Sequence, residues 1–179
     1  MYKRILAIGD IHGEWDKFVS LYRQIDFQPG RDLLVFLGDY IDRGSAPLHV
    51  LKWLFAHKNN EHIIILRSNH EQMMLDYYRE GECNNLWLWN GGDVTRDALD
   101  EEDSTLKEDF LRFIEELPLS YRIVSMPMAN TSSFAMPEWI PIFLWSYRTR
   151  KHFCGYGRSS MIIMMARTSL LPVIPTWST

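Results

Sequence analysis

The segment RILAIGDIHG, residues 4–13, decides the fold class of this chain. Its first part, residues 4–8, is mostly apolar and predicts a buried β-strand. Asp10 and His12 follow directly, at the carboxyl end of the strand, where open α/β sheets usually present their chemistry. Because residues i and i+2 of an extended chain point to the same side, we expect the carboxylate and the imidazole to face one small volume. Taken alone, the segment is equally consistent with a turn that uses Asp and Gly for their backbone preferences.

The same arrangement occurs twice more along the chain. Predicted apolar strands at residues 33–37 and 62–66 are followed by GDYIDRG, residues 38–44, and by RSNHE, residues 67–71. Amphipathic periodicity predicts helices at residues 14–25, 47–57, 71–80 and 105–116, the last with Ser104 as its N-cap. This alternation predicts an α/β layered fold. Three polar strand ends in succession are hard to explain as turns.

The polar residues at the three strand ends form a candidate metal site. Hard and borderline divalent metals prefer carboxylate, imidazole and amide oxygen ligands, which are supplied here by Asp10, His12, Asp39 and Asn69. Two metals about 3.5–4 Å apart need a shared carboxylate, and Asp39, from the middle strand, is the natural bridge. Such a pair binds a phosphate and activates water for in-line attack on phosphorus. The pattern therefore predicts a phosphoester hydrolase.

Four further residues complete the predicted chemistry. The guanidinium groups of Arg43 and Arg67 match phosphate oxygens in a bidentate way. His70 is the candidate acid that protonates the leaving alkoxide, and Asp42 is the candidate partner of its other ring nitrogen. Any one of these charges alone is usually part of a surface ion pair, and for Arg43 alone that alternative is favoured. The combination of residues indicates function more strongly than any single member does.

The motifs GDIHG, GDYIDRG and NHE, in this order over residues 3–120, resemble the metallophosphoesterase superfamily. More narrowly, they resemble the PPP-type serine/threonine protein phosphatases, in particular the small bacterial and bacteriophage members. The resemblance implies a calcineurin-like fold, in which two mixed β-sheets pack as a sandwich flanked by helices. It also implies phosphorylated proteins or peptides as the partners of the chain.

The same resemblance implies roles for individual residues. One of two divalent metal ions, with manganese as the expected metal, would be held by Asp10, His12 and Asp39, and part of the second by Asp39 and Asn69. His70 with Asp42 would be the acid pair, and Arg43 would be a phosphate clamp. These roles agree with those inferred from the residue types alone.

One position inside the matching region departs from the family pattern. The family has glycine before NHE, where this chain has Ser68. Glycine there suggests a turn with positive φ or a close backbone approach, so serine puts the position of Asn69 in question. The segment WNGGDVT, residues 89–95, resembles a stretch near the active-site mouth of bacterial members, although Gly91 and Gly92 are equally consistent with a plain turn.

The composition is that of an ordinary globular protein. The 179 residues are 46% hydrophobic and 23% charged, which is enough for one domain with a core. No apolar run is long enough to span a bilayer, the N-terminal sequence does not predict a signal peptide, and Cys83 and Cys154 predict no disulfide framework. We therefore expect a cytoplasmic protein without a membrane partner, and the net charge of −4 gives no indication of nucleic-acid binding.

The composition changes near Ser125. Residues 125–179 contain one of the 23 acidic residues of the chain, Glu138, and six of its nine methionines. We therefore expect a metallophosphoesterase domain over residues 1–124 and an atypical tail over residues 125–179. The family has two later motifs, HAG and GHT, which each supply a histidine to the second metal, and this chain has neither. We interpret His152, which lies in an unrelated sequence context, as a surface residue.

A shifted reading frame would explain the tail. Because Met and Trp have single codons, Met136-Pro137 must encode Ala in the neighbouring frame and Trp139-Ile140 must encode Asp. Both fall at the correct spacing within a permitted Cys-His-Ala-Gly-Val-Asp, and residues 168–175 permit a Gly-His-Thr. We therefore interpret the tail as a frame-shifted remainder of the same domain. The alternative is a divergent tail with its own role.

The sequence thus predicts a metal-dependent hydrolase of phosphoserine and phosphothreonine in proteins, with a second metal weakened by the two missing histidines. The first alternative is a hydrolase of dinucleotides or other phosphodiesters from the same superfamily. The second is an inactive remnant that binds phosphorylated partners through Arg43 and Arg67.

Overall fold

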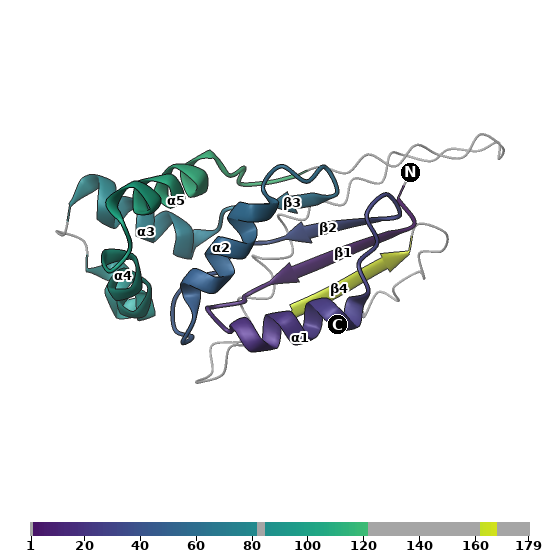
Figure 1. Ribbon diagram of the computed structural model, residues 1–179, viewed down its shortest axis with the longest axis horizontal. Coiled ribbons are helices and arrows are strands. Elements are labelled where there is room, and N and C mark those ends of the chain that lie inside the picture. Colours follow the sequence, from purple (N-terminus) through teal and green to yellow (C-terminus); the bar gives the residue numbers. More distant parts are fainter. Residues whose placement is uncertain (1, 82–84, 122–161, 168–179) are drawn as a thin grey trace, which may run out of the picture.

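Strands and helices alternate along the described part of the chain, as the periodicity predicts. The computed structural model describes residues 2–81, 85–121 and 162–167 (Figure 1). Its elements, in chain order, are β1 (Arg4–Gly9), α1 (Trp15–Ile25), β2 (Asp32–Phe36), α2 (Pro47–His57), β3 (Ile63–Ile65), α3 (Asn69–Glu80), the short helix η1 (Leu88–Gly92), α4 (Asp93–Asp100), α5 (Ser104–Glu116) and β4 (Ile162–Arg167). The predicted α/β fold class is confirmed.

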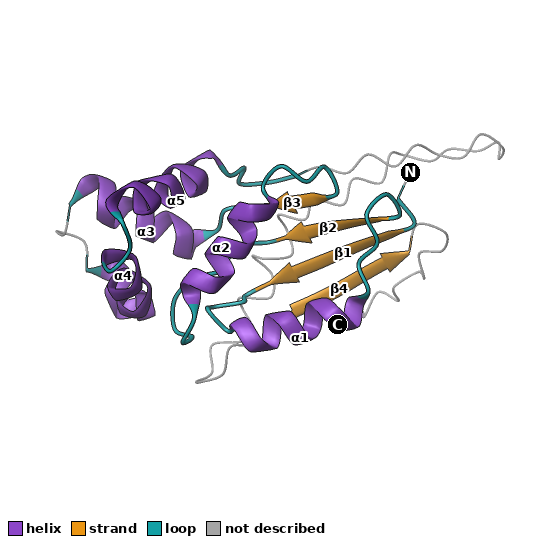
Figure 2. Cartoon of the chain, viewed as in Figure 1, coloured by secondary structure: helices purple, strands orange, loops and turns teal. Residues whose placement is uncertain are grey.

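The described strands form one mixed sheet in the order β3-β2-β1-β4 (Figure 2). β2 is parallel to both β1 and β3, whereas β4 is antiparallel to β1. In Figure 1 the arrowheads of β1 and β2 face the end of the molecule that carries α3, α4 and α5. The loops that follow the three parallel strands therefore lie at one edge of the sheet, next to these helices.

The sheet is covered on one face by α1 and α2. Side chains alternate between the two faces of a strand, so one set points to the helices, namely Leu6, Ile8, Leu34 and Phe36. Leu33 and Val35 belong to a smaller apolar cluster on the opposite face. On the helical side, the ring of Trp53 lies 5.0 Å from that of Phe18 and 5.5 Å from that of Phe36. This packing fixes the strands and thus the positions of the loops that follow them.

Two local details differ from the sequence prediction. The N-cap of α5 is Asp103, whose carboxylate accepts a hydrogen bond from the backbone N–H of Thr105 at 2.9 Å, and Ser104 is the first helical residue. Asp and Ser are equally good N-caps, so the residue types did not distinguish Asp103 from the predicted Ser104. Gly91 and Gly92 do not form a plain turn but end the helical turn η1, which runs directly into α4.

Several predictions fall on residues outside those the structure describes. They are the second sheet of the sandwich, the surface position of His152 and most of the tail, of which the structure describes only β4. None of the helices within the described residues is long and apolar enough to cross a membrane.

Candidate active site

The loops after β1 and β2 are joined by backbone hydrogen bonds. The N–H of His12 donates to the carbonyl of Asp39 at 2.8 Å, and the N–H of Gly13 donates to that of Tyr40 at 2.8 Å. One step earlier, the N–H of Asp10 donates to the carbonyl of Gly38 at 3.3 Å. The two loops therefore run side by side beyond the sheet and bring Asp10, His12 and Asp39 to neighbouring positions.

Left-handed backbone conformations are concentrated in these two loops. Six non-glycine residues among those described have positive φ, and five of them are predicted site residues: Asp10 (55°), His12 (45°), Asp39 (56°), Asp42 (74°) and Arg43 (67°). A non-glycine residue in this region costs about 1–2 kcal/mol. Such strain persists only where the surrounding structure enforces it, and it is typical of active sites.

Asp42 and His70 form a buried hydrogen-bonded pair. The Nδ1–H of His70 donates to Oδ2 of Asp42 at 2.6 Å, and both residues are almost completely buried. Two further donors hold the carboxylate: Trp87 Nε1–H at 2.9 Å and the Thr95 hydroxyl at 2.8 Å. The pair keeps the proton of the imidazole on Nδ1 and leaves Nε2 of His70 to face the site.

Arg43 links the two candidate site histidines. One terminal nitrogen of its guanidinium lies 3.0 Å from Nε2 of His12, and the other lies 3.2 Å from Nε2 of His70. The two imidazole rings meet edge to face, with centroids 4.7 Å apart. Because Nδ1 of His12 lies 3.0 Å from the carbonyl oxygen of Ile41, both histidines carry their proton on Nδ1 and accept from Arg43 on Nε2. Arg43 as a residue is exposed, as a ligand-binding residue must be.

The surroundings of His12 favour its neutral form. Burial lowers the pKa of His12, and the charge of Arg43 acts in the same direction, against the hydrogen bond to the carbonyl of Ile41, which raises it. A histidine must be neutral to bind a metal. The hydrogen bond on Nδ1 leaves Nε2 as the nitrogen for a metal.

The predicted metal ligands share one edge of the sheet and fit a divalent ion by donor chemistry. They are two carboxylates, one imidazole and one amide, from Asp10, Asp39, His12 and Asn69, the last being the first residue of α3. Within the described residues, no three His, Cys, Asp or Glu side chains converge into a metal-binding cluster. Binding of a metal by His12 would require Arg43 to release Nε2. The metal ligands therefore stay a prediction.

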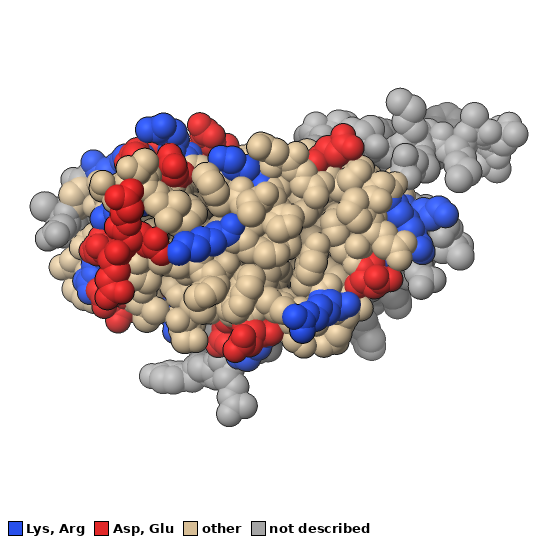
Figure 3. All heavy atoms as spheres, viewed as in Figure 1, with Lys and Arg blue, Asp and Glu red and all other residues tan. Residues whose placement is uncertain are grey.

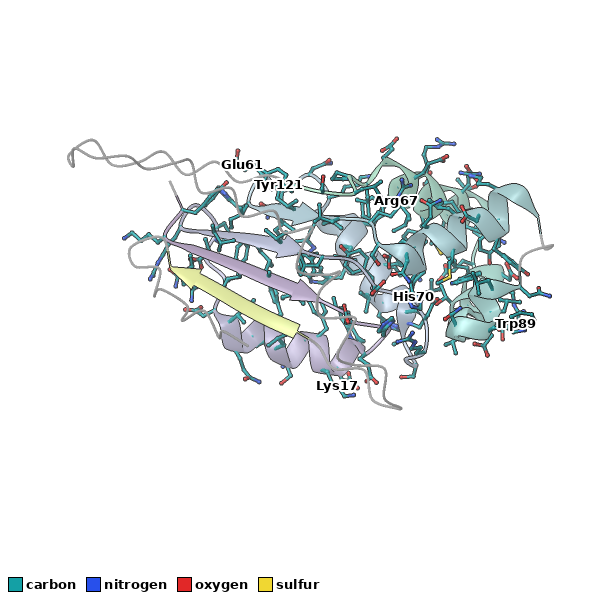
Figure 4. The ribbon with its side chains drawn as sticks, turned by 180° about the vertical axis from the view of Figure 1, so that it is seen from behind. Lys17, Glu61, Arg67, His70, Trp89 and Tyr121 are labelled. Atoms are coloured by element: carbon teal, nitrogen blue, oxygen red, sulfur yellow. The ribbon has the colours of Figure 1, made fainter. Side chains whose placement is uncertain are left out.

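Arg67 lies apart from this network. Its guanidinium donates to the carbonyl of Glu115, and its backbone N–H donates to the carbonyl of Pro118, both near the end of α5. Figure 4 shows Arg67 on the side of α5, separated from His70. The structure thus engages Arg67 with α5 and gives no support to its predicted role as a phosphate ligand.

Three residues that the sequence analysis gave no role support the site. Glu71 is completely buried and accepts hydrogen bonds from the backbone N–H groups of Asp39 (3.0 Å), Tyr40 (2.8 Å) and Ser68 (3.1 Å). Burial and the nearby Asp39 raise the pKa of Glu71 to about 7, although the hydrogen bonds that it accepts favour its charged form. Glu71 is the third residue after the N-cap of α3, so the S-x-x-E capping-box pattern could have identified it.

Trp87 and Thr95 also support the site, because their side chains donate hydrogen bonds to Asp42. The sequence signals near them were the two glycines and the resemblance of residues 89–95 to a stretch near the active-site mouth of bacterial members. A Cβ on Gly92 would lie 2.5 Å from the indole of Trp87, so glycine is required for the ring to reach Asp42. The backbone N–H of Arg43 donates to the carbonyl of Gly91 at 2.9 Å. The segment from residue 87 to residue 95 is therefore a wall of the site.

The geometry can be compared with known proteins. The sequence pattern of the calcineurin-like phosphoesterases matches residues 3–160, which is most of the chain. The chain belongs to the calcineurin-like phosphoesterase family. Members of this family generally bind two divalent metal ions. The match includes every residue predicted here as part of the site.

Proteins similar to this phosphoesterase are named for more than one activity. The chain is 38% identical over 112 residues to serine/threonine-protein phosphatase 2 of Escherichia coli (strain K12), which is 63% of this chain and 49% of that protein. It is 34% identical over 108 residues to a symmetrical bis(5'-nucleosyl)-tetraphosphatase of Chromobacterium violaceum, which is 60% of this chain and 36% of that protein. The chain spans about half the length of the curated relatives it matches, or less.

Among solved structures, a metallophosphoesterase from Sphaerobacter thermophilus is similar to this phosphoesterase. Its TM-score is 0.47 at 18% sequence identity, covering 70% of this chain and 44% of that structure.

Proposed function

We propose that this calcineurin-like phosphoesterase hydrolyses phosphomonoesters of serine and threonine in proteins. One observation supports the proposal most strongly: the guanidinium of Arg43 lies between Nε2 of His12 and Nε2 of His70, and Nδ1 of His70 is held by the buried Asp42. An anion-binding fork thus lies next to an imidazole that can transfer a proton. These are the two groups that phosphomonoester hydrolysis requires besides a nucleophile.

In the proposed reaction Arg43 binds two oxygens of the phosphoryl group through its terminal nitrogens. Once Arg43 has turned from Nε2 of His70 to the phosphoryl oxygens, that nitrogen takes up a proton from solvent. The resulting imidazolium donates this proton to the serine or threonine oxygen as the bond from that oxygen to phosphorus breaks. Asp42 orients the ring and stabilises the imidazolium before the proton leaves. Burial of Asp42 among three donors keeps its carboxylate in one orientation.

The residues at the strand ends would hold two divalent ions, which we expect to be manganese. The donor set is the one described above, with Asp39 as the shared ligand. Divalent ions bound there would supply Lewis-acid activation of the phosphoryl group and of the attacking water. Because the chain lacks the two further histidines of the family pattern, we propose that its second ion binds weakly and that its turnover is reduced.

Phosphorylated proteins or peptides are the partners that we propose, with no nucleic acid and no membrane, in the cytoplasm. Figure 3 shows acidic side chains gathered at the end of the molecule that carries α4. The sequence of this end contains Asp93, Asp97, Asp100 and Glu101, all of them exposed. A negative surface of this kind repels a long polyanion such as DNA.

A second candidate function is hydrolysis of dinucleoside polyphosphates. The 34% identity to a bis(5'-nucleosyl)-tetraphosphatase is close to the 38% identity to a protein phosphatase and specifically supports this candidate. Both activities would use the same arginine and histidine.

The deciding experiment compares two substrates of the full chain with excess Mn²⁺. We expect phosphate release from a phosphoserine peptide and at least tenfold slower cleavage of diadenosine tetraphosphate. Preference for the dinucleotide would overturn the proposal in favour of the second candidate. Binding of the phosphopeptide without turnover of either substrate would favour the inactive remnant. A His70→Asn variant is the control for contaminating phosphatases, since it removes the proposed proton donor.

A further inference from the structure

The hydroxyl group of Ser68 makes two hydrogen bonds to Asp39. Its Oγ accepts from the backbone N–H of Asp39 at 3.0 Å and donates to Oδ1 of the Asp39 carboxylate. The two residues are 29 positions apart in the chain. A contact of this kind joins the loop after β2 to the start of α3, which are the segments that supply Asp39 and Asn69.

The side chain of Ser68 has a fixed position. Ser68 is the N-cap of α3 with φ −117°, an extended conformation, so the site does not need a left-handed residue here. Its N–H donates to Oε2 of the buried Glu71 at 3.1 Å. Its Oγ lies 3.1 Å from the same oxygen, which competes with Asp39 for the single hydroxyl proton. On the other side, a Cβ on Gly38 would lie 2.3 Å from Cβ of Ser68. Gly38 therefore provides the room for Ser68, and Glu71 fixes its orientation.

We propose that Ser68 is a positioning residue that orients the carboxylate of Asp39 for shared metal binding. The inference rests on the proposed function, since it needs Asp39 to be a metal ligand. A hydrogen bond from Ser68 to Oδ1 restricts rotation of the Asp39 carboxylate and would leave its other oxygen in a defined direction for the ions. Hydrogen bonds to ligating carboxylates typically contribute 10–100-fold to metal affinity. The serine thus takes a role in this chain that glycine, without a side chain, cannot have.

A purely structural role for Ser68, as the cap of α3, is the competing explanation. The chain contains a matched control for it. Asp103 caps α5 by accepting a hydrogen bond from the N–H of Thr105 at 2.9 Å, and neither residue contacts the site. Asp103→Ala therefore removes a helix cap without touching Asp39.

The test is Mn²⁺ binding by the full chain, followed through the electron paramagnetic resonance signal of free Mn²⁺, with unfolding in chelator measured in parallel. We expect Ser68→Ala and Ser68→Gly to bind Mn²⁺ about tenfold more weakly than the wild type. Asp103→Ala should lower the unfolding midpoint and leave Mn²⁺ affinity unchanged.

Two results would overturn the inference. If both Ser68 variants bind Mn²⁺ as tightly as the wild type, Ser68 has no effect on the metal and the proposed function is untouched. If Asp103→Ala weakens Mn²⁺ binding as much as the Ser68 variants do, the effect is one of general stability. A wild-type chain that binds no Mn²⁺ overturns the proposed function and this inference with it.

Discussion

At the scale of single residues, the two arginines that were predicted as phosphate ligands have different surroundings. Arg43 is exposed and directs its guanidinium at His12 and His70. Arg67 donates to the carbonyl of Glu115, and its Nε is buried without a partner among the described residues. The residue type was the same in both cases. The difference arises from α5, whose range the sequence predicted but whose contact with Arg67 it did not.

Arg43→Ala should weaken binding of inorganic phosphate by roughly 10–100-fold, because hydrogen bonds to charged groups contribute about 1.5–3 kcal/mol. Arg67→Ala is the matched control and should change phosphate affinity less than threefold. Isothermal titration of each variant with phosphate in excess Mn²⁺ measures both. Equal losses in the two variants would mean that Arg67 contacts the anion after all.

Asp32, at the edge of the sheet opposite the site, predicts how stability depends on pH. Its carboxylate is buried and pairs with Arg4, whose Nε donates at 2.9 Å, and this hydrogen bond holds the pKa of Asp32 below its ordinary value. A carboxyl group whose pKa is lower in the folded state stabilises the fold above its unfolded pKa. That stabilisation is lost as pH falls through the lower, folded value.

Asp32→Asn should therefore lower the free energy of unfolding by about 2 kcal/mol at pH 7. The difference from the wild type should shrink as pH falls from 4 towards 2. Urea unfolding at several pH values tests this, with the exposed Asp16→Asn as a control that changes little. A difference that stays constant down to pH 2 would mean that the pair with Arg4 does not stabilise the charged carboxylate.

At the scale of elements, the segment formed by η1 and the start of α4 holds the acid pair together. Trp87 directly precedes η1, Thr95 lies in α4, and both donate to Asp42. Three donors satisfy this buried carboxylate, and removal of one donor leaves part of it unsatisfied.

Trp87→Phe should lower the free energy of unfolding by about 1–3 kcal/mol, because it removes the indole N–H from the buried carboxylate while keeping an aromatic ring. Trp89→Phe, two residues further on, is the control: Trp89 is 81% exposed, so its effect should stay within about 0.5 kcal/mol. Urea denaturation of both variants measures the change in the free energy of unfolding. If the two variants lose the same stability, the bond from Trp87 to Asp42 does not matter for the fold.

The elements that could be predicted from sequence are those with a clear hydrophobic periodicity and a clear turn or cap residue at the end. The strands at residues 4–9, 32–36 and 63–65 and the helices α1, α2 and α3 begin or end within about two residues of the predicted limits. The pairing of Asp42 with His70 also followed from the motifs.

α4 was missed because its start, Gly91-Gly92-Asp93, has the composition of a turn. Trp87 and Thr95 had no predicted role because their hydrogen bonds to Asp42 cross 45 and 53 positions of the chain. Glu71 had a local signal, the S-x-x-E pattern, but its hydrogen bond from Tyr40 crosses 31 positions.

At the scale of the whole molecule, the tail, residues 125–179, differs in composition from the rest of the chain. The family pattern extends to residue 160, beyond the change of composition at Ser125. The strand β4, residues 162–167, pairs with β1, so a part of the tail extends the sheet. The boundary at residue 124 and the shifted frame stay predictions.

The DNA sequence across codons 118–179 tests the shifted frame. We expect the neighbouring frame to stay open and to encode His-Ala-Gly and then Gly-His-Thr, the two histidine motifs that the chain lacks. A chain expressed from the corrected frame should then bind a second Mn²⁺ ion more tightly than this chain. Stop codons in that frame, or the absence of both histidines, would show that the tail is a genuine divergent segment.

The central claim is that His70, held by Asp42 and placed next to Arg43, is the proton donor of a phosphatase. The most direct measurement compares His70→Asn with the wild-type chain on two phosphomonoesters in excess Mn²⁺, after thermal unfolding has shown that the variant is folded. A phosphoserine peptide needs a proton on its leaving oxygen, whereas p-nitrophenyl phosphate does not. We predict that the variant loses roughly 10²-fold or more of its rate on the peptide and much less on the aryl phosphate. Equal losses on the two substrates, or an unchanged rate on the peptide, would contradict the account.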